Sequence, residues 1–142
     1  MDIYPRVDEN YKKIYPLTDI EKCLKESDVV VLTLPLTSET RYMMNENRFN
    51  SMKDGSVLVN IARGAVVEEN ALIKALDTKL SGAILDVFEE EPLTENNPLW
   101  HKENVIITPH NSFIGDNNET RLTQVVLSNL GEKYEKRSNA HR

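Results

Sequence analysis

The chain has 142 residues, of which 39% are hydrophobic and 28% are charged, with a formal net charge of −6 at pH 7. This composition is typical of a globular domain and argues against disorder, while an acidic chain repels phosphate backbones and is a poor candidate for nucleic-acid binding. Cys23 is the one cysteine, so no intramolecular disulfide can form, and neither a signal-peptide pattern nor a long apolar run is present, which together favour a cytoplasmic protein that does not bind a membrane.

The first third of the chain predicts a loop, a helix and a strand. Residues 1–17 are polar and contain two prolines, which predicts a loop. Thr18, with Glu21 three residues later, forms a capping-box pattern and predicts a short helix through Lys25. The apolar run 29–34 then predicts a buried strand, which ends at a proline because proline cannot continue a central strand.

The middle of the chain alternates predicted helices and strands. Helices are expected over 45–52 and 67–76, and strands over 56–62, 82–88 and 104–110. The three strand segments are rich in Val and Ile and do not alternate with polar residues, which is typical of parallel strands covered on both faces. This order predicts an α/β fold with a parallel sheet flanked by helices.

The last part of the chain predicts an irregular loop and one more helix. Residues 91–100 form the loop, in which Trp100 is predicted to be a packing anchor. A helix is expected from Glu119 to about Tyr134, followed by a polar tail. By length the chain is a single domain, and we expect its ordered core to cover about 18–134.

Ionisable side chains follow three of the predicted strands. Arg63 comes after the strand over 56–62, Glu89–Glu91 after the next strand, and His110 ends the last one. Parallel strands place their carboxyl ends at one edge of the sheet, where ligands bind in open α/β folds. The sequence therefore predicts that a guanidinium, a carboxylate and an imidazole meet at this edge.

Each of these residue types also has a structural interpretation. Arg63 can bind a substrate carboxylate with its planar fork, or form an ordinary surface ion pair. His110 can transfer protons near neutral pH, although a lone histidine is more often structural. The glutamates form either a solvated acidic loop or a partner for the histidine. Asp86, inside an apolar run, is either a structural anchor or a polar contact to a ligand.

Five ordered segments of the chain resemble the NAD-binding domain of the D-isomer-specific 2-hydroxyacid dehydrogenases. They are Leu34-Pro35-Leu36-Thr37 with Glu39-Thr40, Asn60-Ile61-Ala62-Arg63-Gly64, Asp86-Val87-Phe88-Glu89-Glu90-Glu91-Pro92-Leu93, Pro98-Leu99-Trp100 and Thr108-Pro109-His110. The resemblance covers about 18–130, and it includes D-lactate dehydrogenase, phosphoglycerate dehydrogenase and glyoxylate/hydroxypyruvate reductase. It implies a Rossmann-like fold and hydride transfer between NAD and C2 of a 2-oxo or 2-hydroxy acid.

The resemblance also implies roles for single residues. Arg63 would bind the substrate carboxylate, His110 would be the acid/base, and Glu91 would pair with His110. The cofactor-binding residues that it implies are Asp2, Leu34, Pro35, Thr40, Ile61, Ala62 and Asp86. Among these, Asp2 would bind the adenosine ribose and favour NAD over NADP, and Asp86 would contact the nicotinamide amide. We expect no metal site.

The chain departs from the family pattern at its start. No G-x-G-x-x-G motif and no first two strands of the nucleotide fold precede Asp2, so we expect a partial domain, weak or inactive alone. In the strand order 3-2-1-4-5-6, strands 1 and 2 would separate the strand over 29–34 from that over 56–62. Without them, the two strands would pair directly, or a second copy would cover an exposed edge and form a homo-oligomer.

Two other readings of the same residues stay open. The chain is a non-catalytic, corepressor-like binding module, or it is a degenerate remnant of a dehydrogenase. The first predicts loss of Arg63, Glu91 or His110, and all three are present. The identity of the 2-oxo acid does not follow from these residues.

Overall fold

The structure is a computed structural model that describes residues 9–112 and 115–139. The chain divides into two compact units, Met1–His110 and Asn111–Arg142. The first unit contains the sheet and the predicted site. The second contains one long helix, α4 (Asn118–Asn139).

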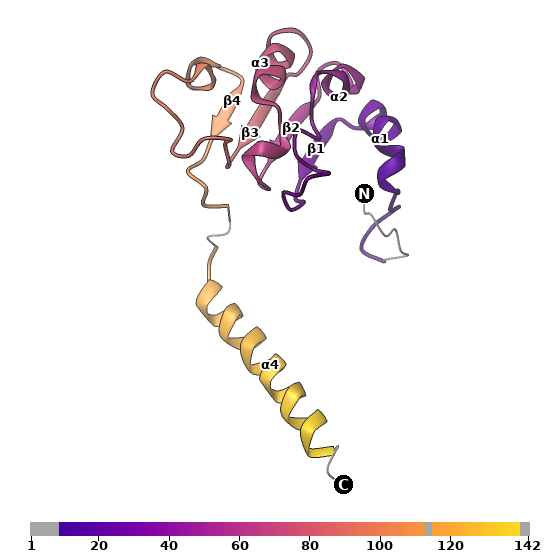
Figure 1. The fold of residues 1–142 in the computed structure, drawn as a ribbon, viewed down its shortest axis with the longest axis vertical. Helices are drawn as coiled ribbons and strands as arrows, with labels where there is room; N and C mark the ends of the chain where they lie inside the picture. Colours follow the sequence, from indigo (N-terminus) through magenta and orange to yellow (C-terminus); the bar gives the residue numbers. More distant parts are fainter. Residues whose placement is uncertain (1–8, 113–114, 140–142) are drawn as a thin grey trace. The chain divides into compact units, whose positions relative to one another are not determined.

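The first unit is built on a parallel sheet with the order β1-β2-β3-β4 (Figure 1). The strands are β1 (Val29–Leu32), β2 (Val57–Asn60), β3 (Gly82–Leu85) and β4 (Val105–Ile107). The predicted α/β fold with a partial Rossmann-like parallel sheet is thus confirmed. Each strand is shorter than its apolar run, because the last residues of each run turn away to form the loops at the carboxyl edge.

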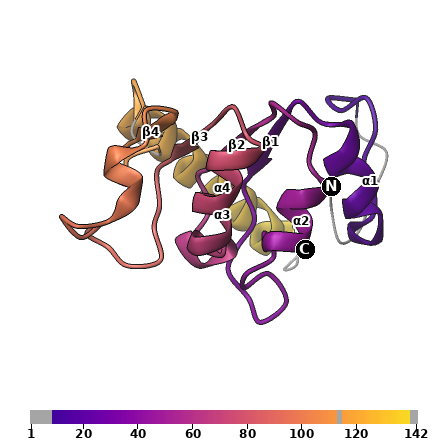
Figure 2. The same cartoon turned by 90° about the horizontal axis from the view of Figure 1, so that it is seen from above.

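Short helices connect these strands. They are η1 (Leu17–Asp19), α1 (Ile20–Glu26), α2 (Glu46–Ser51), η2 (Gly64–Val66), α3 (Glu69–Thr78) and η3 (Pro98–His101). Helices α2 and α3 pack together on one face of the sheet (Figure 2). The stripe predicted in α3 is confirmed, since Ala71, Leu72, Ala75 and Leu76 are all buried. The side chain of Asn45 caps α2 by accepting a hydrogen bond from the Arg48 N–H at 3.2 Å.

The predicted capping box at Thr18 is wrong. The Asp19 N–H donates to the Pro16 carbonyl at 3.0 Å, so a 3₁₀ turn already includes Thr18 before α1 begins at Ile20. A residue inside a helical turn cannot act as its N-cap. The Thr18 hydroxyl instead lies 3.4 Å from the Asp19 carboxylate.

The prediction that the strand over 29–34 is buried is wrong for most of β1, and the prediction that both faces are covered is wrong for β4. One row of sheet positions, which includes Leu58, Ala83 and Leu85, is buried against the helices. The alternate row faces the other way, and at its ends Val29, Val31 and Ile106 are 54%, 52% and 60% exposed. An apolar run alone does not show whether a second layer covers a strand.

The direct pairing expected between the first two strands is confirmed. β1 and β2 are hydrogen-bonded parallel neighbours with Val29 opposite Val57 and Leu32 opposite Asn60. The first strand of this chain therefore occupies the position next to β2, and its other edge is unpaired in the described residues.

The loop between β3 and β4 is anchored by a different residue from the one predicted. Leu99 is fully buried in the core, whereas its neighbour Trp100 is 49% exposed. The Trp100 indole N–H donates to the Thr94 carbonyl at 3.0 Å, so the ring stabilises the loop from outside.

Within the described part of the chain, no helix is both long enough and apolar enough to cross a lipid bilayer.

Candidate functional site

The turn that carries Arg63 is held by a buried asparagine at the end of β2. The Asn60 side chain accepts from the Ala62 N–H and donates to the Arg63 carbonyl, both at 3.1 Å. Asn60 is fully buried, and these two bonds satisfy its amide. They fold the chain tightly after β2 and leave the Arg63 side chain exposed, with its Nη1 2.6 Å from the Ala62 carbonyl oxygen.

Gly64 lets this turn lie directly against the loop after β3. A Cβ atom at Gly64 would be 1.8 Å from the Phe88 carbonyl carbon and 2.3 Å from the Glu89 nitrogen. No side chain fits there, so the glycine is required by close backbone approach. The Arg63 turn and the loop that bears Glu91 are therefore in backbone contact.

Glu91 and His110 form a side-chain pair across the ends of β3 and β4. His110 Nδ1 lies 2.7 Å from Glu91 Oε2, and the other carboxylate oxygen accepts from the Phe88 N–H at 2.9 Å. The carboxylate is thereby fixed from behind and presents one oxygen to the ring. A carboxylate at Nδ1 orients the imidazole and leaves Nε2 for a ligand.

The environment of Glu91 favours its ionised form. Partial burial acts to raise its pKa, but the hydrogen bond from the Phe88 N–H and the contact with His110 oppose this, and the pKa of Glu91 is lowered below its ordinary value of 4.5. The carboxylate is therefore charged near neutral pH and can stabilise a protonated imidazole.

Asp86 anchors the end of β3 to the segment that presents His110. The Thr108 hydroxyl donates to the buried Asp86 carboxylate. The Thr108 N–H donates to the Leu85 carbonyl at 3.0 Å, and the His110 N–H bonds back to the Thr108 carbonyl at 3.1 Å. His110 itself adopts φ = +52°, a left-handed conformation that is uncommon outside glycine. The anchor holds this turn in place.

The register of the sheet brings the three predicted groups to one edge. Asn60 is opposite Leu85, which is opposite Ile107, and Arg63, Glu91 and His110 follow these residues by three to six positions. Contact is shown for Glu91 and His110. Among the described residues, no hydrogen bond or ion pair joins Arg63 to either of them; its exposed side chain follows β2, the strand that pairs with β3.

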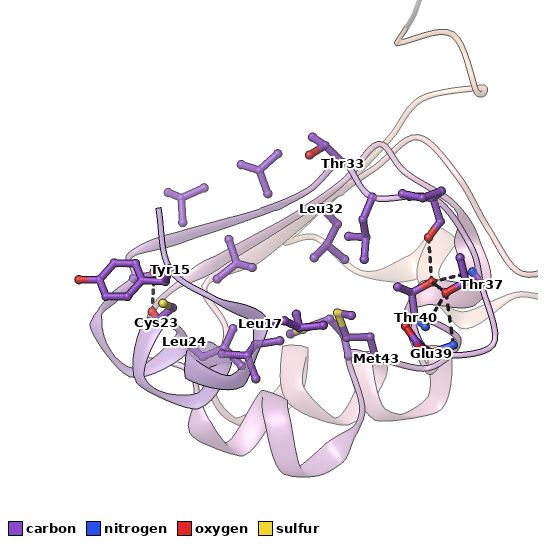
Figure 3. A pocket seen from close by; sticks show the side chains of 18 of the residues that line it. Tyr15, Leu17, Cys23, Leu24, Leu32, Thr33, Thr37, Glu39, Thr40 and Met43 are labelled. Atoms are coloured by element: carbon purple, nitrogen blue, oxygen red, sulfur yellow. Dashed lines mark hydrogen bonds between the residues drawn. The ribbon is translucent and has the colours of Figure 1, made fainter. Parts of the chain in front are cut away.

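The cofactor residues predicted after β1 line a pocket of about 730 Å³. Leu34, Pro35 and Thr40 contribute to it, along with apolar side chains from β1 and α1. Figure 3 shows Leu32 facing Leu17 and Met43 across the pocket, with Thr37 and Thr40 at one end and Tyr15 at the other. The buried Thr40 hydroxyl donates to the Pro35 carbonyl at 2.8 Å and shapes that end. This volume suits a small-molecule site.

The other predicted cofactor residues lie further along the same edge. Ile61 is 40% exposed after β2, while Ala62 and Asp86 are buried. The residues after β1, β2 and β3 thus follow three neighbouring strands at the carboxyl edge of the sheet. Asp2 lies outside the described residues. In the described ranges, no cluster of three or more metal-ligating side chains occurs.

The structural roles of two residues at this edge were not predicted from the sequence. Asn60 and Thr108 hold the turns that carry Arg63 and His110. Both are polar residues at the end of an apolar run, as Asp86 is, and a buried polar residue must find a hydrogen-bond partner. This placement was a signal that could have identified them.

Comparison with known proteins gives a consistent result. Residues 1–112 match the profile of the D-isomer specific 2-hydroxyacid dehydrogenase NAD binding domain. The glyoxylate reductase of Pyrococcus furiosus is 49% identical over 112 residues, which are 78% of this chain and 33% of that protein. The chain therefore spans about a third of the length of the curated relatives it matches.

Solved structures resemble the fold as well. A D-isomer specific 2-hydroxyacid dehydrogenase family protein from Aeromonas salmonicida has a TM-score of 0.79 at 37% identity, covering 92% of this chain and 42% of that one. A second, from Xanthobacter autotrophicus in complex with NADPH and MES, has a TM-score of 0.66 at 46% identity, covering 68% and 32% respectively.

Proposed function

Because the chain belongs to the D-isomer specific 2-hydroxyacid dehydrogenase family, we propose that it supplies the catalytic side chains for NAD-dependent reduction of a 2-oxo acid to a D-2-hydroxy acid. The observation that carries this proposal is the pair formed by Glu91 and His110, 2.7 Å apart. An imidazole oriented by a carboxylate beside an exposed arginine suits proton transfer to a substrate that bears its own carboxylate.

Arg63 binds the substrate in this proposal. Its exposed guanidinium forms two parallel hydrogen bonds with the carboxylate of the 2-oxo acid. The turn beneath it is fixed by Asn60 and by the contact of Gly64 with the Phe88 backbone. The bound acid is therefore held with its C2 carbonyl toward the neighbouring strand ends.

His110 is the acid/base. Its Nε2–H donates the proton to the C2 oxygen during reduction, and the same nitrogen removes it in the reverse direction. Glu91 holds the ring through Nδ1 and stabilises the imidazolium. When bound, the nicotinamide supplies the hydride that reaches C2.

The row of residues along the carboxyl edge holds the cofactor. The pocket lined by Leu34, Pro35 and Thr40 would hold the adenosine half, and Ile61, Ala62 and Asp86 would contact the nicotinamide half. We propose NAD, because the carboxylate of Asp2 repels a 2′-phosphate. NADPH is nevertheless the cofactor in the Xanthobacter relative's complex, so both must be tested.

The first substrate to test is glyoxylate, because the curated relatives that match this chain include several glyoxylate reductases. The 142 residues contain no G-x-G-x-x-G motif, and we expect the dinucleotide to bind weakly and turnover to be slow. A panel of larger 2-oxo acids completes the assay.

The decisive experiment follows the oxidation of NADH, and separately NADPH, by absorbance with each 2-oxo acid. His110→Gln should lower kcat by about 10²–10⁴-fold. His101→Gln is the matched control, because His101 is an exposed histidine in η3 outside the site. Equal activities of the two variants would refute the assigned role, and a chain that binds dinucleotide without any turnover would favour the non-catalytic module.

A further inference from the structure

Three residues with exposed side chains, Arg41, Tyr42 and Glu89, form a compact cluster beside the site. The Tyr42 hydroxyl donates to the Glu89 carboxylate. Arg41 Nη2 donates to the same carboxylate oxygen at 3.2 Å and to the Tyr42 hydroxyl at 3.0 Å, and the guanidinium carbon lies 4.6 Å from the centre of the Tyr42 ring. The hydrogen bond to Glu89 raises the pKa of Tyr42, so the phenol remains a donor. We call these residues the Tyr42 cluster.

The backbone of Tyr42 is bonded to the segment that follows Arg63. The Tyr42 N–H donates to the Ala65 carbonyl at 2.8 Å, and the Met44 N–H donates to the Val66 carbonyl at 3.0 Å. An isolated parallel bridge between Met44 and Val67 extends this contact. Tyr42 is thus tied through its main chain to the turn that presents the guanidinium.

The side chain of Tyr42 is tied to the loop that presents Glu91. Glu89 precedes Glu91 by two residues, and its backbone nitrogen lies against Gly64. Tyr42 therefore bonds to both loops. Its backbone N–H binds the segment that follows Arg63, and its hydroxyl binds the loop that carries Glu91.

Burial does not hold the side chains of the cluster together. Tyr42 is 36% exposed, and Arg41 and Glu89 are exposed as well. Tyr42 nevertheless adopts φ = +49°, which is costly for a bulky residue and persists only where surrounding contacts impose it. Such strain occurs most often at functional sites.

We propose that the Tyr42 cluster is a positioning device that fixes the spacing between the Arg63 guanidinium and the Glu91–His110 pair. The inference rests on the proposed function, because this spacing matters only if substrate lies between the two. Arg41, Tyr42 and Glu89 are positioning residues and need not touch the substrate. Loss of the device leaves both halves of the site present but poorly aligned, which lowers kcat more than it changes KM.

The first test needs no turnover and uses the full 142-residue chain. In Tyr42→Phe, nuclear magnetic resonance should show increased backbone mobility of residues 88–91 and loss of the nuclear Overhauser contact between the Gly64 Hα and the Glu89 amide. Tyr11→Phe is the matched control, because Tyr11 is 65% exposed and outside the cluster. Unchanged mobility and contact in Tyr42→Phe would overturn the proposal.

The second test uses kinetics and a rescue. Tyr42→Phe and Glu89→Ala should each lower kcat about tenfold while KM for glyoxylate stays within about twofold. Glu89→Gln keeps an acceptor for the phenol and should restore most of kcat. Equal kcat values in all variants would refute the proposal. If the wild-type chain shows no turnover but the resonance changes occur, the result refutes the proposed function. It still supports the inference that the Tyr42 cluster holds the two loops together.

Discussion

Glu91 contacts His110 with one carboxylate oxygen and the Phe88 N–H with the other, so a single side chain joins the ends of two neighbouring strands. Both contacts favour the ionised carboxylate, since they lower the pKa of Glu91 against the opposing effect of partial burial. The link between β3 and β4 at the site therefore depends on pH.

The first prediction concerns the stability difference between the wild type and Glu91→Gln. Because the folded-state pKa of Glu91 is lowered, the ionised carboxylate stabilises the fold above its unfolded-state pKa, and this contribution is lost as the pH falls through the folded-state pKa. Urea unfolding should show the wild type as more stable near pH 7, with the difference shrinking as the pH falls below the ordinary carboxyl pKa of about 4. A difference that grows on acidification would contradict the role of the ionised carboxylate.

Much of the site followed from the sequence because it depends on strand order. Apolar runs ending in Arg63 and His110 place these residues at one edge of any parallel sheet, and the position of Glu91 relative to the proline singled it out within the resemblance. The positioning contacts were not predictable in the same way. The hydrogen bonds of Tyr42 with Ala65 and Glu89 join segments far apart in the chain, and no local pattern encodes them.

The errors in the fold have a common physical origin. An apolar run at Val29–Leu32 indicates that a strand forms, but exposure depends on which other layers pack against it. A Thr-x-x-Glu spacing indicates a helix start only if the preceding turn is not already helical, and the Pro16 carbonyl closes such a turn. In both cases tertiary context decided the outcome.

The second prediction concerns substrate binding by Arg63. Arg63→Lys keeps the charge but loses the planar, two-point recognition of a carboxylate. If this removes one charge-assisted hydrogen bond of about 1.5–3 kcal/mol, KM for glyoxylate should rise by about ten- to a hundredfold. Steady-state kinetics measures this, with Arg121→Lys in the second unit as the control. An unchanged KM would show that Arg63 does not bind the substrate carboxylate.

The third prediction concerns the backbone contact beneath the site. Gly64→Ala places a Cβ 1.8 Å from the Phe88 carbonyl carbon, which only a shift of the main chain can relieve. Destabilisation should reach about 3 kcal/mol or more. Thermal unfolding followed by circular dichroism tests this.

Gly115→Ala is the control for that experiment. Its added Cβ would meet the Asn118 side chain at 3.5 Å, an ordinary van der Waals distance, and it should change stability by no more than about 0.5 kcal/mol. Similar stabilities of the two alanine variants would mean that the two loops are not in close contact.

The fourth prediction concerns association of the chain with itself, which we propose occurs through the exposed edge at β1. This strand has one edge unpaired in the described residues, and Val29 and Val31 are more than half exposed. An open edge next to exposed apolar side chains recruits another strand, and a second copy offers the same surface in a self-complementary pairing. Val31→Lys places a charge in this surface and should shift a wild-type dimer toward monomer in sedimentation velocity at equal concentration. Glu39→Lys is the control, because it introduces a lysine outside the strand and should leave the dimer intact. A monomeric wild type, or a dimer that persists in Val31→Lys, would rule out association through β1.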